Sequence, residues 1–446
     1  MINSIRVRNF KSFENIEVSL DKFNVLIGAN ASGKSNFVSL FRFLKDCLDS
    51  GLNNAISMQG GVDYLRNASI CAKNLVVDIL FKTQARTDYT VSMTLEGKRT
   101  FGELDINKLR YMFKIEFPKS ENGYRVGEEK LESSFTLRHT EKKRGNRAKR
   151  WKEVGKGELV IWRHGKDEIE CTMKPDTLPT AMEDIFPIQR IEKSASPKKV
   201  SKMRGSDKEL LIVRGGQSLA SLLENSLFSP FTGAVAAYIN NISTYDIDPK
   251  LSKRSTAVTG KTVLESDGNN LAIVLQEILS NEKNKEKLLN ILRDALPFVN
   301  TLWVERLSDK SVLTCLKESY CGKKLMPAPF ISDGTMSLLA LIVALHFTQN
   351  SLLVIEEPER SIHPRLISRV ISMMKDASER MNKQVIVTTH NPEVVKYAGI
   401  DSILLAYRDK NGFSQVSRPA EKSEVKEFLT NNMGVEELFV QNMLQW

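Results

Sequence analysis

Glycine, lysine and serine residues near the N-terminus have the types and the spacing that bind phosphate. The pattern Gly28-x-x-x-x-Gly33-Lys34-Ser35 follows the apolar run Val25–Ile27. Glycines let consecutive backbone N–H groups turn toward phosphate oxygens, a lysine ammonium neutralises the β- and γ-phosphates, and a serine hydroxyl ligates Mg²⁺. The sequence therefore predicts a loop that binds the phosphates of ATP.

A helix over residues 36–48 should follow this loop and point the positive end of its dipole at the phosphates. The alternative is a glycine-rich turn between a strand and a helix, without a ligand. The strand before the loop and the helix after it favour the phosphate-binding interpretation. The residues that we expect to bind the cofactor here are Asn30, Ala31, Ser32, Gly33, Lys34, Ser35 and Asn36, and Ser35 is also an expected metal ligand.

Two adjacent carboxylates end a buried strand in the second half of the chain. The run Leu352–Ile355 is wholly apolar and leads directly into Glu356 and Glu357. In α/β sheets, ligands bind at the carboxyl ends of the strands, where these acids would emerge. We expect Glu356 to support Mg²⁺, directly or through water, and Glu357 to polarise the attacking water. The alternative is a pair of solvated acids at a strand end.

A short polar motif precedes the most apolar helix of the sequence. Ser332, Asp333, Gly334 and Thr335 stand before an apolar run that ends at Phe347. Ser332 and Asp333 are good N-cap residues, so a simple helix cap is one interpretation. The same geometry can hold a γ-phosphate, because a helix N-terminus is an anion site. The position of the motif about twenty residues before the acidic pair favours the second interpretation.

A histidine ends another apolar strand. The sequence VIVTTH places His390 directly after the strand predicted over residues 384–388. A histidine at this edge of the sheet can hydrogen-bond the γ-phosphate and sense its loss. We therefore expect His390 to act in catalysis beside Glu357.

Alternating strands and helices must position these residues in one sheet. Helices are expected over residues 218–227, 230–242, 269–279, 284–295, 335–348 and 364–381, and a loop with one helical turn over residues 50–67. Between the two ends, period-two runs predict an antiparallel β lobe. The expected divisions are 1–72 for the first part of the nucleotide-binding unit, 73–177 for the β lobe, 178–300 for a helical insertion and 301–446 for the second part.

Composition and charge restrict the classes of protein. The 446 residues carry a net charge of +10, which permits a nucleic-acid or acidic-protein partner without requiring one. The basic stretch Thr140–Lys156 and the polar connection Pro187–Gly205 are the clearest charge clusters. No signal peptide or membrane span is expected, and the five cysteines lack metal-ligand spacing. We therefore expect a cytoplasmic protein with free thiols.

Together these motifs resemble the ABC-type ATPases of the SMC/RecF-like group. The chain is most similar to the compact subgroup that includes overcoming-lysogenization-defect ATPases and the ATPase subunits of bacterial anti-phage systems. The resemblance implies an α/β ABC-type head with a mixed, largely parallel sheet, an inserted antiparallel β lobe, a helical lobe and no long coiled coil. It rests on Phe10–Phe13, Gly28–Ser35, Leu264–Ala272, Ser332–Thr335, Glu356–Glu359, Ile362–Pro364 and Thr389-His390.

The resemblance also implies a mechanism in which two heads enclose ATP. Lys34 of one head would face Ser332–Thr335 of the other, with Ser361–His363 along the seam. Two residues depart from the usual pattern: Glu356 stands where these ATPases usually have aspartate, and Asp333 where they have glycine. The glutamine that senses Mg²⁺ is not placed by the motifs, and Gln59 is one candidate.

Three functions fit the resemblance. The first is an ATP-driven switch in an anti-phage system that holds or activates a separate effector, such as a nuclease or toxin. The second is a DNA-binding repair ATPase of the RecF type. The third, a self-contained nuclease, needs a D-x-D metal motif, and the 56 residues after His390 contain none. The expected cofactors are ATP and Mg²⁺, and the expected partners are a second copy of the chain or a higher homo-oligomer, an effector protein and DNA, with no membrane.

Overall fold

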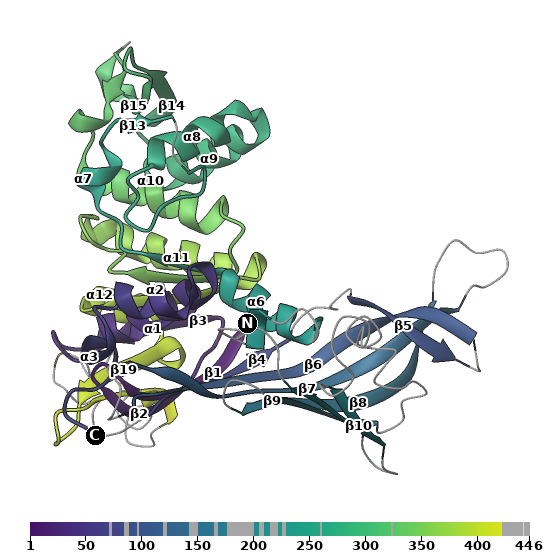
Figure 1. Cartoon of the computed structure of the whole chain (residues 1–446). Helices are drawn as coiled ribbons and strands as arrows, with labels where there is room; N and C mark the ends of the chain where they lie inside the picture. The colour runs from purple at the N-terminus through teal and green to yellow at the C-terminus, as the bar shows by residue number, and fades with distance from the viewer. Residues whose placement is uncertain are drawn as a thin grey trace. The chain divides into compact units, whose positions relative to one another are not determined.

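The structure divides into two compact units (Figure 1). The first comprises Met1–Leu20 and Phe43–Asn240, and the second comprises Asp21–Arg42 and Asn241–Trp446. The structure is a computed structural model, which describes residues 1–70, 74–83, 89–95, 98–118, 123–141, 150–164, 168–175, 200–204, 209–214, 222–224, 229–258, 261–322, 324–421 and 440.

The first unit is built on one antiparallel sheet. Its strands follow the order β10-β11-β9-β8-β7-β6-β4-β1-β2, and β5 pairs with β6. The long strands β6, β7 and β8 lie side by side (Figure 1). The strands are β1 (Ile2–Phe10), β2 (Phe13–Ser19), β4 (Asn74–Lys82), β5 (Tyr89–Leu95), β6 (Lys98–Glu116), β7 (Arg125–Glu141), β8 (Arg150–His164), β9 (Glu168–Pro175), β10 (Val200–Arg204) and β11 (Glu209–Arg214).

Period-two alternation gives this sheet one buried face. Along β4 every second side chain is buried, from Leu75 to Phe81. Phe81 stacks on Tyr238 of helix α6 (Phe231–Asn240), with ring centroids 5.0 Å apart. The apolar face of the sheet is therefore covered in part by α6, as the alternation requires.

Residues 50–67 are more helical than the sequence pattern predicts. They form α2 (Gly51–Met58) and α3 (Val62–Leu65), where we expected a loop with one helical turn. Ala55 and Ile56 of α2 and Leu65 of α3 are buried. Packing of these few apolar side chains stabilises helices that the polar, glycine-containing sequence alone does not indicate.

The two units do not coincide with the divisions expected at residues 72, 177 and 300. Strands β10 and β11 extend the antiparallel sheet beyond residue 177. The stretch 178–300 is divided between the units at Asn240 and contains strands as well as helices. Much of the connection Pro187–Gly205 and of the helix expected at 218–227 lies outside the described residues, although 222–224 form the short helix η2.

The second unit contains a six-stranded, largely parallel sheet in the order β12-β17-β18-β3-β19-β20. Only the pairing of β19 with β20 is antiparallel among its described strands. The sheet joins strands from both ends of the chain, as the sequence predicts. The strands are β3 (Phe23–Ile27), β12 (Ile242–Tyr245), β17 (Leu352–Glu356), β18 (Gln384–Thr389), β19 (Ile403–Arg408) and β20 (Ser414–Ser417).

Helix α10 is the centre of the hydrophobic core of this unit. Every residue from Thr335 to Leu345 is buried, which explains why the run is apolar on all sides. It packs against α7, α9 and α11, while α11 and α12 contact β3. The helices are α1 (Lys34–Asp49, which continues into the first unit), α7 (Pro249–Ser252), α8 (Leu271–Ser280), α9 (Glu282–Ala295), α10 (Asp333–His346), α11 (Pro364–Arg380) and α12 (Pro392–Ala398).

A small antiparallel sheet completes the second unit. Its strands are β13 (Thr256–Ala257), β14 (Val299–Arg306), β15 (Ser311–Glu318) and β16 (Met326–Pro327), with the short helices η4 (Ser319–Cys321) and η5 (Ala328–Phe330) nearby in sequence. The remaining short helices of the unit are η6 (Ile400–Ser402) and η7 (Pro419–Glu421).

The expected α/β class with an antiparallel β lobe is confirmed. The helices expected at 36–48, 335–348 and 364–381 correspond to α1, α10 and α11 within two residues at each end. Within the described part of the chain, the longest helix is α11 with 17 residues, too short for a long coiled coil. No described helix combines the length and the hydrophobicity needed to cross a lipid bilayer.

His346, the last residue of α10, makes the second unit sensitive to acid. Burial, together with the charges of Lys287 and Lys383, lowers the pKa of His346 to about 4. The unfolded chain binds this proton near pH 6.5, so between pH 6.5 and 4 the unfolded state binds more protons and folding stability falls as the pH falls. At pH 5 we expect this residue to lower the free energy of unfolding by about 1–2 kcal/mol.

Denaturant titrations at pH 7 and pH 5 measure this effect. His346→Leu is expected to reduce the loss of stability between the two pH values. His139→Leu, in the first unit, controls for the removal of an imidazole. An equal acid sensitivity of wild type and His346→Leu would contradict the assignment.

A candidate ATP site at the carboxyl edge of the parallel sheet

Strand register brings the predicted motifs to one edge of the sheet. Glu356 of β17 lies opposite Thr388 of β18, and Thr389 lies opposite Ile27 of β3. The strands are parallel, so Glu357, His390 and the loop that begins at Gly28 all follow carboxyl ends at the same edge. This is the edge at which α/β sheets bind ligands.

The phosphate loop is tightly curled and held from behind. Ala31 and Gly33 have positive φ angles of 63° and 113°, which turn the backbone inward. A Cβ at Gly28 would lie 2.2 Å from the carbonyl oxygen of Ala406 in β19, so only glycine fits there. Two residues that the sequence motifs do not indicate support the loop: Arg408 Nε donates to Ala31 O at 2.9 Å, and Ser414 Oγ donates to Ser32 O at 2.7 Å.

Lys34 and Ser32 are prepared for an anionic ligand. The ammonium of Lys34 donates to the carbonyl oxygens of Gly28 and Ala29, at 2.7 and 3.0 Å. Burial lowers its pKa, and the charge of Glu357 opposes this change. The buried hydroxyl of Ser32 has no hydrogen-bond partner among the described residues. A phosphate group fits this loop, because it would replace the carbonyl contacts of Lys34 and offer acceptors to buried donors.

Glu356 forms an ion pair with an arginine that the sequence motifs do not indicate. Arg42 Nη2 lies 2.6 Å from Glu356 Oε1, and Arg42 Nε donates to Thr244 Oγ1 at 3.3 Å. Burial raises the pKa of Glu356, and Arg42 opposes this rise. Oε2 has no hydrogen bond to the described residues, so an oxygen remains for a cation.

A magnesium ion fits the chemistry of this edge. Ser35 and Glu356 supply the hydroxyl and carboxylate oxygens that Mg²⁺ prefers, and phosphate oxygens and water usually complete its ligands. In the described part of the chain, no group of three or more histidine, cysteine, aspartate or glutamate side chains could hold a metal.

The carboxylate of Glu357 is hydrogen-bonded on both oxygens. Oε1 lies 3.0 Å from His390 Nδ1, and Oε2 lies 3.2 Å from Arg360 Nη2. Burial, the largest single influence, raises the pKa of Glu357, but the hydrogen bonds from Arg360 and His390 outweigh it and hold the pKa below its usual range. Glu357 is therefore ionised and oriented, as a general base must be.

The backbone around Glu357 is strained and fixed. Its φ angle of 42° lies in a region that residues other than glycine rarely adopt, at a cost of about 1–3 kcal/mol. Its N–H donates to Thr388 O at 2.9 Å. Behind it, the buried Glu359 accepts a hydrogen bond from Thr389, the residue before His390. This network sets the directions of both Glu357 and His390.

The motif Ser332–Thr335 begins α10 as a true helix cap. Ser332 Oγ accepts from Thr335 N at 3.1 Å. A Cβ at Gly334 would lie 2.6 Å from the carbonyl oxygen of Ser361, so this glycine allows a close approach of the segment after the acidic pair. Asp333 forms an ion pair with Lys253. A simple helix cap and an anion-binding helix N-terminus have the same geometry. Contact of this motif with a nucleotide on a second copy therefore stays a prediction.

The structure adds Arg42, Asp246, Lys253, Arg360 and Arg408 to the residues expected from the sequence. Each is a charged residue whose role depends on a contact with a distant part of the chain. The sequence gives a weak indication for Asp246, since it follows the short run Ile242–Tyr245, in which three of the four residue types favour strands. Gln59 lies at the end of α2 in the first unit, and its role stays a prediction.

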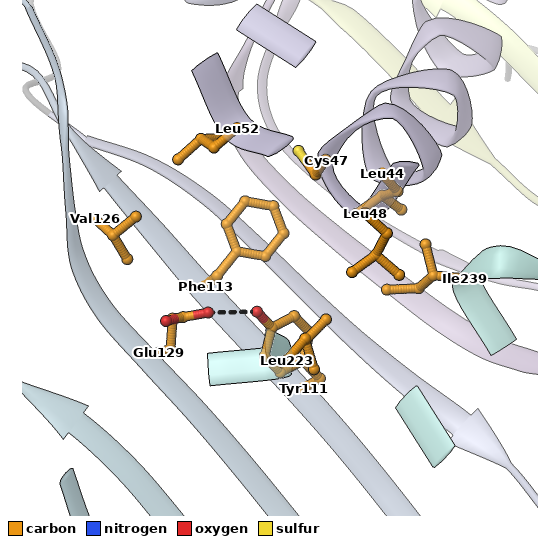
Figure 2. Close-up of a pocket in the computed structure, with 10 residues that line it drawn as sticks. All are labelled: Leu44, Cys47, Leu48, Leu52, Tyr111, Phe113, Val126, Glu129, Leu223 and Ile239. Atoms are coloured by element: carbon orange, nitrogen blue, oxygen red, sulfur yellow. Dashed lines mark hydrogen bonds between the residues drawn. The ribbon is translucent and has the colours of Figure 1, made fainter. Parts of the chain in front are cut away.

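The first unit contains a cavity whose lining differs chemically from the edge of the parallel sheet. It is an apolar cavity of about 40 Å³ (Figure 2). Glu129 points into it but is engaged by Tyr111 Oη at 2.6 Å, Arg163 Nη1 at 2.7 Å and Leu222 N at 2.8 Å. These three hydrogen bonds compensate the burial of a carboxylate among apolar side chains, so its role in the fold is structural. The lining residues are Leu44, Cys47, Leu48, Leu52, Tyr111, Phe113, Val126, Glu129, Leu223 and Ile239.

Comparison with known proteins places more than half of the chain in one family. A profile of the family described as "AAA domain, putative AbiEii toxin, Type IV TA system" matches residues 23–140 and 230–396. Among curated proteins, "Endonuclease GajA" of Bacillus cereus (strain VD045) is 43% identical over 44 residues, which span 10% of this chain and 8% of that protein.

Two solved structures are also similar. An SMC head bound to the C-winged helix domain of ScpA has a TM-score of 0.47 at 14% identity, with 93% of this chain and 97% of that chain covered. The SMC head domain from Thermotoga maritima has a TM-score of 0.40 at 12% identity, with 94% and 98% covered.

Proposed function

Because the chain belongs to the family of AAA domains described as putative AbiEii toxins of type IV toxin–antitoxin systems, we propose that it is an ATP-hydrolysing switch of the SMC/RecF-like group. One observation carries this proposal. The phosphate loop and the oriented carboxylate of Glu357 lie at the same edge of the parallel sheet, close enough for the charge of Glu357 to act on Lys34. Phosphate binding and water activation are then combined in one site.

Each residue of the edge has a distinct part in hydrolysis. Lys34 binds the β- and γ-phosphates, and the N–H groups of the loop and of α1 surround them. Glu357 accepts the proton of the attacking water, while His390 keeps its carboxylate in position and faces the γ-phosphate. Ser35 and Glu356 would hold Mg²⁺, which when bound neutralises charge on the phosphates.

The site is completed by a second copy of the chain. Ser332, Asp333, Gly334 and Thr335 bind the nucleotide held by Lys34 of the other copy. In this arrangement, bound ATP holds two heads together, and its hydrolysis allows them to separate. A head-to-head dimer, or a larger homo-oligomer built from such pairs, is therefore the working form of the protein.

The biological role that we propose is that of the ATPase component of a cytoplasmic anti-phage system. Its family is described through a toxin–antitoxin system, and its short match is to an endonuclease. The ATPase cycle would hold or activate a separate nuclease or toxin. The alternative is a RecF-type repair ATPase, which the net charge of +10 permits. Residues 142–149 of the basic stretch Thr140–Lys156 lie outside the described residues.

Purified chain incubated with plasmid DNA, Mg²⁺ and ATP distinguishes these roles. We expect ATP turnover without cleavage of the plasmid, because the effector is a different protein. Lys34→Ala and Glu356→Ala proteins, purified in the same way, control for a contaminating nuclease. Cleavage by the wild-type chain that both variants lose would contradict a separate effector. Tight DNA binding that weakens steeply with salt would favour the repair role instead.

A further inference from the structure

Arg360 is shared between two carboxylates at the edge of the sheet. Its Nη2 lies 3.2 Å from Glu357 Oε2, and its Nη1 lies 2.9 Å from Asp246 Oδ1. Each carboxylate attracts the same guanidinium, so the position of Asp246 influences how firmly Arg360 holds Glu357. Asp246 therefore acts on the proposed base through Arg360, without touching it.

Asp246 begins a short segment that is anchored by its backbone. It directly follows Tyr245, the last residue of β12, and its N–H donates to Ser266 O at 2.8 Å. Asp248 N donates to Asp267 O at 3.0 Å, and the carboxylate of Asp248 caps α7 by accepting from Lys250 N at 2.8 Å. We call residues Asp246–Lys253, which include α7, the linking segment.

The other end of the linking segment contacts the signature-like motif. Lys253, the C-cap of α7, forms an ion pair with Asp333 in the first turn of α10. The side chain of Lys253 is 17% exposed and that of Asp333 is 41% exposed, so the lysine end of this pair is largely shielded from water. A cation beside Asp333 also compensates the negative charge that this residue would bring close to a phosphate.

The loop behind the linking segment makes it stiff. Asn270 is buried, and its side chain donates to Lys261 O and Val263 O at 2.8 Å and accepts from Glu265 N at 2.9 Å. Gly268 has a φ of 76°, and a Cβ there would lie 2.6 Å from Ser252 Oγ in α7. A displacement of Lys253 is therefore transmitted along the segment.

We propose that the linking segment couples Asp333 of the signature-like motif to Glu357, with Lys253, Asp246 and Arg360 as positioning residues. The proposal rests on the proposed function, in which Asp333 faces the nucleotide of a second copy and Glu357 acts on the nucleotide of its own. A nucleotide that contacts Asp333 changes the electrostatic attraction between Asp333 and Lys253. The linking segment transmits this change to Arg360. Binding of the second copy's nucleotide near Asp333 thereby alters the position of Glu357 at the chain's own nucleotide.

Steady-state ATP hydrolysis tests the coupling through a double-mutant cycle. Lys253→Met and Asp246→Asn are each expected to lower kcat about three- to tenfold with KM little changed, because they alter the orientation of the base and leave the phosphate loop intact. Combined, they should lower kcat no further than the stronger single variant does. Lys250→Met, an exposed change on the same helix, should leave turnover unchanged. Additive losses in the double variant would overturn the coupling.

Hydrogen exchange gives a readout that does not depend on turnover. In Lys253→Met, exchange should accelerate at the linking segment and also at residues 357–362, where Arg360 N donates to Glu357 O at 2.9 Å. Acceleration confined to residues 246–253 would overturn the proposal even if the chain hydrolysed no ATP. A different result would contradict the proposed function alone: the wild type hydrolyses no ATP, yet exchange in Lys253→Met accelerates at both the linking segment and residues 357–362.

Discussion

Glu357→Gln is expected to lower ATP turnover by about two orders of magnitude or more while ATP remains bound. Glutamine keeps the size of the side chain and can still contact Arg360 and His390, but it cannot accept a proton from water. The phosphate loop is untouched, so the affinity for ATP should be close to that of the wild type. Phosphate release and equilibrium binding of ATP measure the two effects separately.

Glu379→Gln is the matched control, since it makes the same change at an exposed position of α11. It should hydrolyse ATP at the wild-type rate. Wild-type turnover by Glu357→Gln would show that another group activates the water, and the assignment of the base would then be wrong.

Lys34→Ala is expected to weaken ATP binding by about tenfold to a hundredfold. The ammonium of Lys34 donates to the carbonyl oxygens of Gly28 and Ala29, and we propose that phosphate oxygens replace these partners when a nucleotide binds. Removal of the charge therefore costs charge-assisted hydrogen bonds to the ligand. Titration with a fluorescent ATP analogue measures the loss.

Lys45→Ala removes a lysine from the same helix and serves as the control for Lys34→Ala. Lys45 donates to Asn240 O in the first unit, at 3.0 Å, and should not affect nucleotide affinity. Equal affinities of Lys34→Ala and wild type would exclude the loop as the phosphate site.

The elements that carry the site could be predicted from local sequence because local patterns determine them. Strands β3, β17 and β18 lie in the centre of a parallel sheet, so each contains a buried hydrophobic run: Val25–Ile27, Leu352–Ile355 and Val385–Val387. Glycine spacing marks the phosphate loop, and the long apolar run of α10 marks the core. Motif order along the chain then places both ends in one sheet.

The charged partners of the site could not be predicted, since they depend on contacts between distant residues. Arg42 reaches Glu356, and Arg360 reaches Asp246, only after the sheet has formed. Strand β12 has only four residues. A period-two pattern of this length cannot be distinguished from the end of the helix expected over residues 230–242. Strands β10 and β11 follow a basic, polar stretch, so composition favoured a connection there.

A mixture of two inactive variants tests most directly whether a second copy completes the ATP site. Ser332→Arg changes the surface that we propose to face the other copy, and Lys34→Ala changes the proposed phosphate loop, so each protein alone should be inactive. In a random mixture of equal parts, half of the dimers combine one of each and contain one intact site. We expect the mixture to recover about a quarter of the wild-type ATP turnover. No recovery from subunits shown to exchange would contradict a site shared between two copies.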